Sequence, residues 1–157
     1  MSTLHQYCAT VNSNIEDLAP FVKLRAVKAF DVCHASNCDI YMFEGLRSAD
    51  RQDYLYASSR SRPGVWLTDA QGWQSFHQYG VAMDLAFGGP GKWTWQGNWE
   101  RVLEIFHGYG FTSLPARKEI AHVQMNCGLS WREAKSLYDK SQKLNDVWTT
   151  IEKRLPS

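Results

Sequence analysis

Two histidines and one aspartate have the residue type and spacing that suit a metal ion. Residues 75–84 read Ser-Phe-His-Gln-Tyr-Gly-Val-Ala-Met-Asp, so His77 precedes a glycine and Asp84 follows four residues after it. Imidazole nitrogen and carboxylate oxygen are both good zinc ligands. A catalytic zinc site needs a third protein ligand and an open position for water, and His122 can supply that ligand. We therefore predict one zinc ion held by His77, Asp84 and His122.

Alternating polarity indicates how two of these ligands come together. In residues 81–87 the odd positions are all apolar, whereas Asp84 lies between two alanines on the opposite face. Residues 121–125 read as a second strand, on which His122 and Gln124 share a face. If the two strands pair antiparallel, cross-strand neighbours have Cβ atoms about 5 Å apart, which is close enough to share an ion. His77 must then reach the site from a loop.

The remaining pattern predicts an α+β domain with a small antiparallel sheet flanked by helices. Apolar residues at Leu24, Val27 and Phe30 indicate one face of a helix over 18–36, and Ser130 with Glu133 forms a capping box. The other expected elements are a strand over 39–44, helices over 49–60 and from Asn98 to about 108, a long loop over 61–75 and a C-terminal helix over 130–154. We expect a single domain over 1–157, with its core in 15–126.

Composition excludes several classes of protein. The chain has 157 residues and a formal charge of +1, from 17 basic and 16 acidic side chains, which gives no electrostatic case for binding nucleic acid. No segment has the roughly 18 apolar residues of a membrane span, so no integral membrane association is expected. The first residues lack the pattern of a signal peptide, so synthesis in the cytoplasm is expected. The four cysteines form no Cys-x-x-Cys pair and are expected to be free thiols, although a bond between Cys33 and Cys38 is conceivable after export.

Seven tryptophans leave two interpretations open. Trp66, Trp73, Trp93 and Trp95 fall in expected loops. Their flat rings could line a groove for sugar or peptide, since aromatic side chains offer a large contact area. They could equally hold the long loops against the core.

Three segments in order resemble the M15 family of zinc peptidases. The first is Glu44-Gly-Leu-Arg-Ser with Gln52 and Tyr56, the second is the Ser-x-His-x-x-Gly-x-Ala-x-Asp pattern of 75–84, and the third is Glu119-Ile-Ala-His-Val-Gln. The resemblance covers roughly residues 15–126. It implies a hedgehog/DD-peptidase-like fold and activity as a peptidoglycan peptidase, either a D-alanyl-D-alanine carboxypeptidase or dipeptidase or an L-alanyl-D-glutamate endopeptidase.

The resemblance also implies roles for individual residues. His77, Asp84 and His122 would bind the zinc ion. Glu119 would act as general base on zinc-activated water, and Arg47 would steady the oxyanion or a substrate carboxylate. Ser75, Arg47 and Gln52 would contact the substrate. Glu119 and His122 are an odd number of residues apart and would face oppositely in a regular strand, so we expect Glu119 in irregular backbone before the strand.

The segment after Arg47 and the 61–75 loop are similar to those of the endopeptidase branch, which favours cleavage between L-alanine and D-glutamate. The leading hypothesis is a monomeric, bacteriolytic endolysin of phage type, which would reach the cell wall in the periplasm after release from the host cytoplasm. A carboxypeptidase with the same metal site is the first alternative. A non-catalytic peptidoglycan-binding module and a structural zinc protein are the others.

Overall fold

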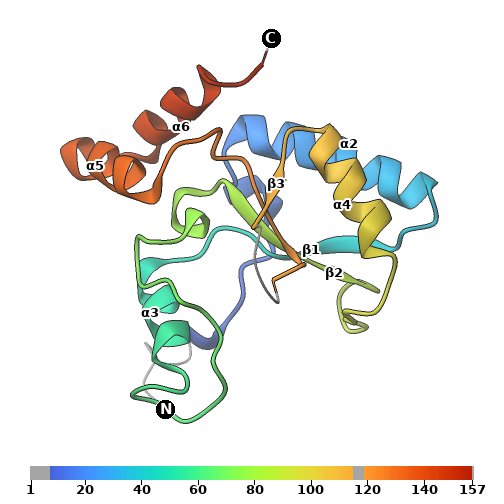
Figure 1. Ribbon diagram of the computed structural model, residues 1–157, viewed down its shortest axis with the longest axis horizontal. Helices are drawn as coiled ribbons and strands as arrows, with labels where there is room; N and C mark the ends of the chain where they lie inside the picture. The colour runs from blue at the N-terminus through green and yellow to red at the C-terminus, as the bar shows by residue number, and fades with distance from the viewer. Residues whose placement is uncertain (1–7, 115–118, 157) are drawn as a thin grey trace.

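Four short strands form one antiparallel sheet at the centre of the molecule (Figure 1). This computed structural model describes residues 8–114 and 119–156. The strands are β1 (Ile40–Glu44), β2 (Ala82–Phe87), β3 (Thr112–Ser113) and β4 (His122–Gln124), in the spatial order β1-β2-β4-β3. The α+β class and the antiparallel pairing of the two expected ligand strands are confirmed, and β2 and β4 are the inner strands.

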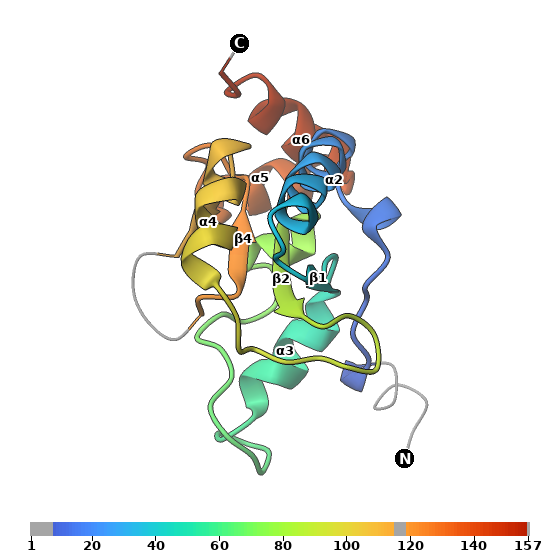
Figure 2. The ribbon, with the colours of Figure 1, turned by 90° about the vertical axis from the view of Figure 1, so that its right-hand side faces the viewer.

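Helices cover both sides of this sheet. Helices α2 (Pro20–Ala35) and α4 (Trp99–Gly108) lie together over one face, and α3 (Ala49–Ala57) lies on the other side (Figures 1 and 2). Two 3₁₀ helices, η1 (Ile15–Asp17) and η2 (Phe76–Tyr79), precede α2 and β2. The apolar face of β2 forms the centre of the core with α2 and α4, through buried residues that include Val22, Met83, Leu85, Val102 and Phe106. The polar face of β2 is thereby turned toward α3 and the loop that follows it.

Local capping explains where the helices begin. The Ser48 side chain accepts a hydrogen bond from the backbone N–H of Arg51 at the start of α3, and Asn98 does the same for Arg101 at the start of α4. The expected capping box of Ser130 and Glu133 opens α5 (Trp131–Ser141).

The C-terminal segment is two helices, which corrects the prediction of one helix over 130–154. Helix α5 ends at Ser141, and α6 begins at Leu144 and ends at Glu152. Gln142 between them has a left-handed backbone with φ of 57°, which ends an α-helix. The apolar residues of both helices keep one helical repeat across the break, so periodicity alone indicated a continuous helix.

Two further details differ from the sequence prediction. Leu24 and Val27 of α2 are 57% and 41% exposed, whereas Ala26, Ala29 and Cys33 are fully buried. Phe21 and Val22 in the first turn are buried as well, and Phe30 packs partly buried against the core. Along the rest of the helix the fully buried contacts come from small side chains. The two-residue strand β3 was not predicted, because so short a segment carries no alternation that could be recognised.

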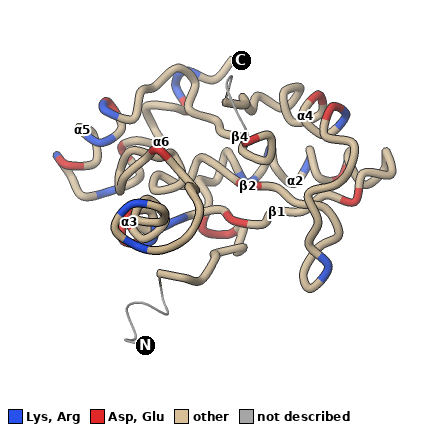
Figure 3. The backbone as a smooth tube through the Cα atoms, turned by 60° about the horizontal axis from the view of Figure 1, so that its bottom comes forward, with Lys and Arg blue, Asp and Glu red and all other residues tan. Residues whose placement is uncertain are grey.

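The state of the cysteines and the distribution of charged residues are as expected from the composition. The four cysteines are free thiols. Lys and Arg positions are interspersed with Asp and Glu positions along α3, α4 and α5 (Figure 3). Among the described residues, no helix has both the length and the apolar character needed to cross a membrane.

Candidate metal centre

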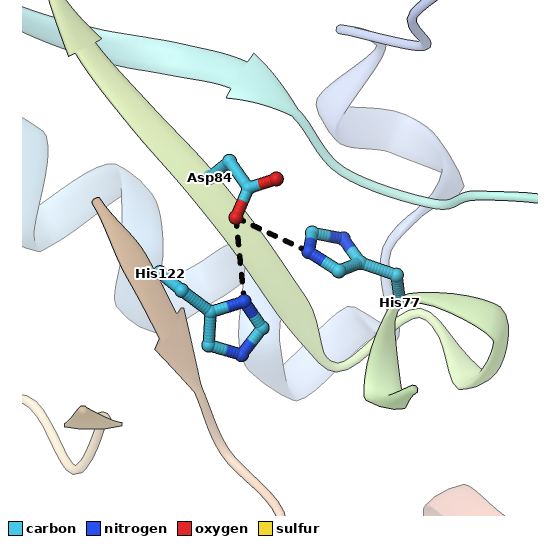
Figure 4. A group of neighbouring side chains, drawn as sticks. All are labelled: His77, Asp84 and His122. Atoms are coloured by element: carbon cyan, nitrogen blue, oxygen red, sulfur yellow. Dashed lines mark hydrogen bonds and ion pairs between the residues drawn. The ribbon is translucent and has the colours of Figure 1, made fainter. Parts of the chain in front are cut away.

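Asp84 and His122 face each other across the two inner strands. They are direct partners in the antiparallel register of β2 and β4, so their side chains lie on the same face of the sheet. Asp84 Oδ1 lies 3.3 Å from His122 Nδ1 and 3.3 Å from His77 Nε2 (Figure 4). The three candidate ligand atoms all lie within 4.8 Å of one another. The structure therefore brings together the three residues that the sequence analysis selected as metal ligands.

His77 reaches this face from the short helix η2. Ser75 caps that helix, and its Oγ accepts a hydrogen bond from the His77 backbone N–H at 3.3 Å, while Gln78 completes a capping box. Gly80 ends the helix with φ of 69°, a left-handed conformation that favours glycine and lets the chain turn directly into β2. The spacing between His77 and Asp84 in the sequence therefore covers the end of η2, the turn at Gly80 and the first residues of β2.

The hydrogen bond of His77 fixes which of its ring nitrogens is free. Nδ1 lies 2.7 Å from the backbone carbonyl oxygen of Gly45. A carbonyl oxygen only accepts hydrogen bonds, so Nδ1 carries the hydrogen and donates it. In the neutral imidazole, Nε2 then presents a lone pair to Asp84 Oδ1.

A chain of hydrogen bonds between side-chain amides determines which ring nitrogen of His122 carries the hydrogen. Asn126 Nδ2 donates to the carbonyl oxygen of Leu129 at 3.0 Å, so Asn126 Oδ1 is free to accept from Gln124 Nε2 at 3.1 Å. Gln124 Oε1 then accepts from His122 Nε2 at 2.9 Å. The neutral His122 ring therefore presents the lone pair of Nδ1 to Asp84 Oδ1.

Three acceptor atoms consequently converge without a donor among them. Two imidazole lone pairs and one carboxylate oxygen repel one another unless a cation or a proton lies between them. Two imidazoles and one carboxylate match the His and acidic ligands of catalytic zinc sites. The donor set of His77, Asp84 and His122 therefore fits a zinc ion.

Asp84 is held through its second oxygen. Arg47 Nη2 donates to Asp84 Oδ2 at 2.9 Å, Arg47 Nη1 donates to Gln52 Oε1 at 3.0 Å, and Arg47 Nε donates to Glu44 Oε1. Glu44 also accepts from Arg51 at 2.7 Å, and Arg51 donates to the carbonyl oxygen of Cys8. With Glu44 only 1% exposed, these groups form a buried ionic network beneath the Asp84 carboxylate.

A β-bulge creates this network. The register pairs Met42 with Leu85 and then Glu44 with Asp84, so Phe43 is the extra residue on β1. Without the bulge Glu44 would lie opposite Met83, on the core face of the sheet. The bulge brings Glu44 onto the face of Asp84 and leaves Phe43 at the cavity that His77, Asp84 and His122 also line.

The three candidate ligands shift one another's protonation. Burial lowers the pKa of His77, and Arg47 and His122 lower it further against the opposing charge of Asp84. Burial acts to raise the pKa of Asp84, but His77, His122 and Arg47 together hold it well below its usual range. For His122 burial acts to lower the pKa, yet the hydrogen bond and charge of Asp84 outweigh it and raise the pKa. Without a metal, His122 is therefore the group that most readily takes up the compensating proton.

The candidate ligands lie in a cavity of about 490 Å³. Glu119 lines the same cavity, lies outside any strand and has an exposed side chain, as expected for a residue in irregular backbone before β4. Its carbonyl oxygen accepts a hydrogen bond from the His122 backbone N–H at 3.0 Å. Other described residues around the cavity include Phe43, Leu67, Ser75, Trp95, Leu114, Ile120 and Trp131.

The other candidate residues have mainly supporting positions. Gln52 is fully buried and forms hydrogen bonds with Arg47, Gln78 and the 68–70 loop, so it lies beneath the cavity. Its contact with substrate stays a prediction, and the burial of its side chain disfavours it. Ser75 lines the cavity but also caps η2. Arg47 lines it too, with its three donor nitrogens directed to protein groups.

Glu44, Arg51 and Asn126 contribute to the site without having been predicted from the sequence. Glu44 was recognised only as part of a motif. No motif or spacing in the sequence pointed to Arg51 or Asn126. The contact of Gln124 with His122 could be predicted from the sequence, because residues two apart in a strand share a face.

Comparisons with known proteins show similarity to a peptidoglycan endopeptidase. No protein-family model matches the chain. The chain is 35% identical over 106 residues to the peptidoglycan L-alanyl-D-glutamate endopeptidase CwlK of Bacillus subtilis (strain 168), a match that covers 60% of this chain and 64% of that relative. The chain thus matches slightly less than two thirds of the relative's length.

A solved structure supports the fold. The LdcB LD-carboxypeptidase, described for its peptidoglycan recognition, matches with a TM-score of 0.54 and 20% identity, over 84% of this chain and 68% of that one. The fold class predicted from the sequence, and the family resemblance drawn from its three motifs, are confirmed.

Proposed function

We propose, on the premise that this chain is similar to the M15 zinc peptidases, that it is a zinc-dependent peptidase of bacterial peptidoglycan. The bond we propose is that between L-alanine and D-glutamate in the stem peptide, which is the bond named for the relative CwlK. The observation that carries the proposal is the convergence of three acceptor atoms, from His77, Asp84 and His122, at a cavity.

The residues around these atoms suit amide hydrolysis. A bound zinc ion would lower the pKa of water and polarise the scissile carbonyl group. Glu119 lines the cavity and has an exposed carboxylate, so it can take a proton from the attacking water and pass it to the leaving amine. Hydrolysis of the amide then yields a free carboxylate on L-alanine and a free amine on D-glutamate.

Arg47 and Ser75 are proposed to act mainly by positioning. Arg47 holds the non-ligand oxygen of Asp84, and Ser75 holds the helix that carries His77. A direct contact of either residue with substrate remains a prediction from the family resemblance, and both line the cavity.

The decisive experiment combines metal analysis with product analysis. Purified protein is loaded with zinc and incubated with peptidoglycan, and the released fragments are identified by mass spectrometry. We expect one zinc ion per chain and new L-alanine carboxyl ends paired with D-glutamate amino ends. Free D-alanine as the product would instead identify a carboxypeptidase, and absence of any cleavage by the zinc-loaded protein would indicate a binding module.

A substitution tests the proposed general base. Glu119→Gln removes the basic carboxylate without changing its size, so we expect the turnover number to fall about 100-fold or more while zinc content is retained. Glu152→Gln, at an exposed position of α6, is the matched control and should keep full activity. Full activity of Glu119→Gln would refute this mechanism.

A further inference from the structure

An aromatic ridge leads away from the candidate metal centre along the edge strand β1. The Phe43 ring lies 5.3 Å from the Trp95 ring at 72° and 5.3 Å from the Trp93 ring at 90°, measured between centroids. Phe43 and Trp95 line the cavity that holds the candidate ligands. Phe43 occupies this position because it is the extra residue of the β-bulge. The two tryptophans come from the loop between β2 and α4, which Figure 2 shows crossing below the sheet.

The ridge ends at a second cavity. Trp93 lines a space of about 330 Å³ together with Phe30, His34, Tyr41 and Met42. Phe43 thus connects two cavities through edge-to-face contacts, with Trp95 on the side of the metal centre and Trp93 on the other side. Trp95 is 51% exposed, so a large part of its side chain can contact a ligand from the solvent side.

The charge distribution separates the two ends of this surface. The metal end holds Asp84, Arg47 and Glu119. Among the described residues that line the second cavity, none is Asp, Glu, Lys or Arg. An ionised ligand would lose hydration there without gaining a partner, so this cavity suits an uncharged ligand with apolar faces.

We propose that the ridge of Trp95, Phe43 and Trp93 binds the glycan strand of peptidoglycan, with N-acetylated sugar rings packed on the aromatic faces. The inference rests on the proposed function, which supplies the polymer. In peptidoglycan L-alanine is the amino acid joined to the glycan, so a scissile bond at L-alanine brings the sugars within one residue of the metal centre. The stem peptide carries ionised carboxylates, whereas sugar rings offer neutral C–H faces that match the chemistry of the ridge.

The test compares two substrates that share one scissile bond. One is the stem peptide on a glycan of several disaccharides, and the other is the free stem peptide. We expect Trp95→Ala and Trp93→Ala each to lower kcat/KM about tenfold on the glycan-linked substrate and less than twofold on the free peptide. Trp66→Ala is the matched control, since Trp66 is also exposed, at 56%, and lines neither cavity. Its ratio of the two kcat/KM values should equal that of the wild type.

A binding measurement separates this inference from the proposed function. Peptide-free glycan strands are titrated into the chelator-treated protein and followed by tryptophan fluorescence and calorimetry. Saturable binding that is lost in Trp95→Ala and Trp93→Ala, with unchanged thermal unfolding, supports the ridge even if the wild type cleaves nothing. Absence of binding by the wild type, or equal losses on both substrates, would overturn the inference, and the latter would assign the ridge to the peptide.

Discussion

Arg47 Nη2 lies 2.9 Å from Oδ2 of Asp84, and the other oxygen of that carboxylate faces both imidazoles at 3.3 Å. The carboxylate is therefore shared between a protein cation on one side and the candidate metal position on the other. Because Glu44 holds Arg47, the orientation of the Asp84 carboxylate depends on a residue outside the candidate ligand set.

Asp84→Asn should lower zinc affinity on the order of 100-fold, because the neutral amide loses the charge that a zinc ion requires from this ligand. The measurement is a competition titration against a chromophoric chelator. Asp31→Asn, at an exposed position of α2, should bind zinc like the wild type. Wild-type affinity in Asp84→Asn would remove this carboxylate from the ligand set.

Glu44→Gln should weaken zinc binding about 10- to 100-fold and destabilise the fold by roughly 3–5 kcal/mol. It removes the negative charge between two buried guanidinium groups and so frees Arg47 from its anchor. Urea unfolding gives the stability, and zinc titration of the folded fraction gives the affinity.

The control for Glu44 is an ion pair at the surface. Glu104→Gln breaks an exposed pair with Arg101 and should cost no more than about 1 kcal/mol, with zinc binding unchanged. If the two variants behave alike, the buried network does not position the ligand.

Stability at alkaline pH should depend on Cys33. Burial, reinforced by Cys38, raises the pKa of Cys33 to about 11, against an ordinary value of 9.0. Between these values the unfolded chain has lost the thiol proton and the folded chain keeps it, so the free energy of unfolding falls as pH rises, by up to about 2 kcal/mol. Below pH 9 the contribution is fully present.

The measurement is urea unfolding of wild type and Cys33→Ala from pH 8 to pH 10.5. The cavity left by Cys33→Ala lowers stability by an amount that does not depend on pH, so the free energy of unfolding of the wild type minus that of the variant should fall as pH rises. A constant difference would show that the Cys33 thiol titrates alike in both states.

Gln142→Gly should stabilise the protein by about 0.5–1 kcal/mol, because the left-handed conformation of Gln142 costs an L-residue about 1–2 kcal/mol and the greater entropy that glycine loses on folding offsets part of this gain. Lys140→Gly, inside α5, is the opposite control and should destabilise by about 1 kcal/mol. Chemical denaturation of both variants checks the signs, and equal losses would argue against the strain at Gln142.

The pairing of Asp84 with His122 could be predicted because alternation along two strands fixes which side chains share a face. The β-bulge that brings Glu44 opposite Asp84 could not, since one extra residue in a register leaves no mark in composition or periodicity. For the same reason the supporting place of Gln52, which depends on contacts with three distant segments, became visible only in the fold.

The helices were predicted where local signals were strong. Asn98 and Ser130 mark helix starts through side-chain caps, and both are confirmed. The buried face of α2 was misassigned at Leu24 and Val27, because periodicity favoured these apolar residues while the core is contacted by the smaller Ala26 and Ala29. The end of α5 depends on the left-handed backbone conformation of Gln142. It could not be predicted, because glutamine rarely adopts that conformation.

Trp148 of α6 donates a hydrogen bond from Nε1 to the carbonyl oxygen of Tyr79 at 2.7 Å, two residues beyond His77 in η2. The helix that presents His77 is thus held by a segment near the end of the described chain. No residue of α6 lines the cavity, so the orientation of η2, and with it that of His77, depends on a hydrogen bond from a helix outside the candidate site.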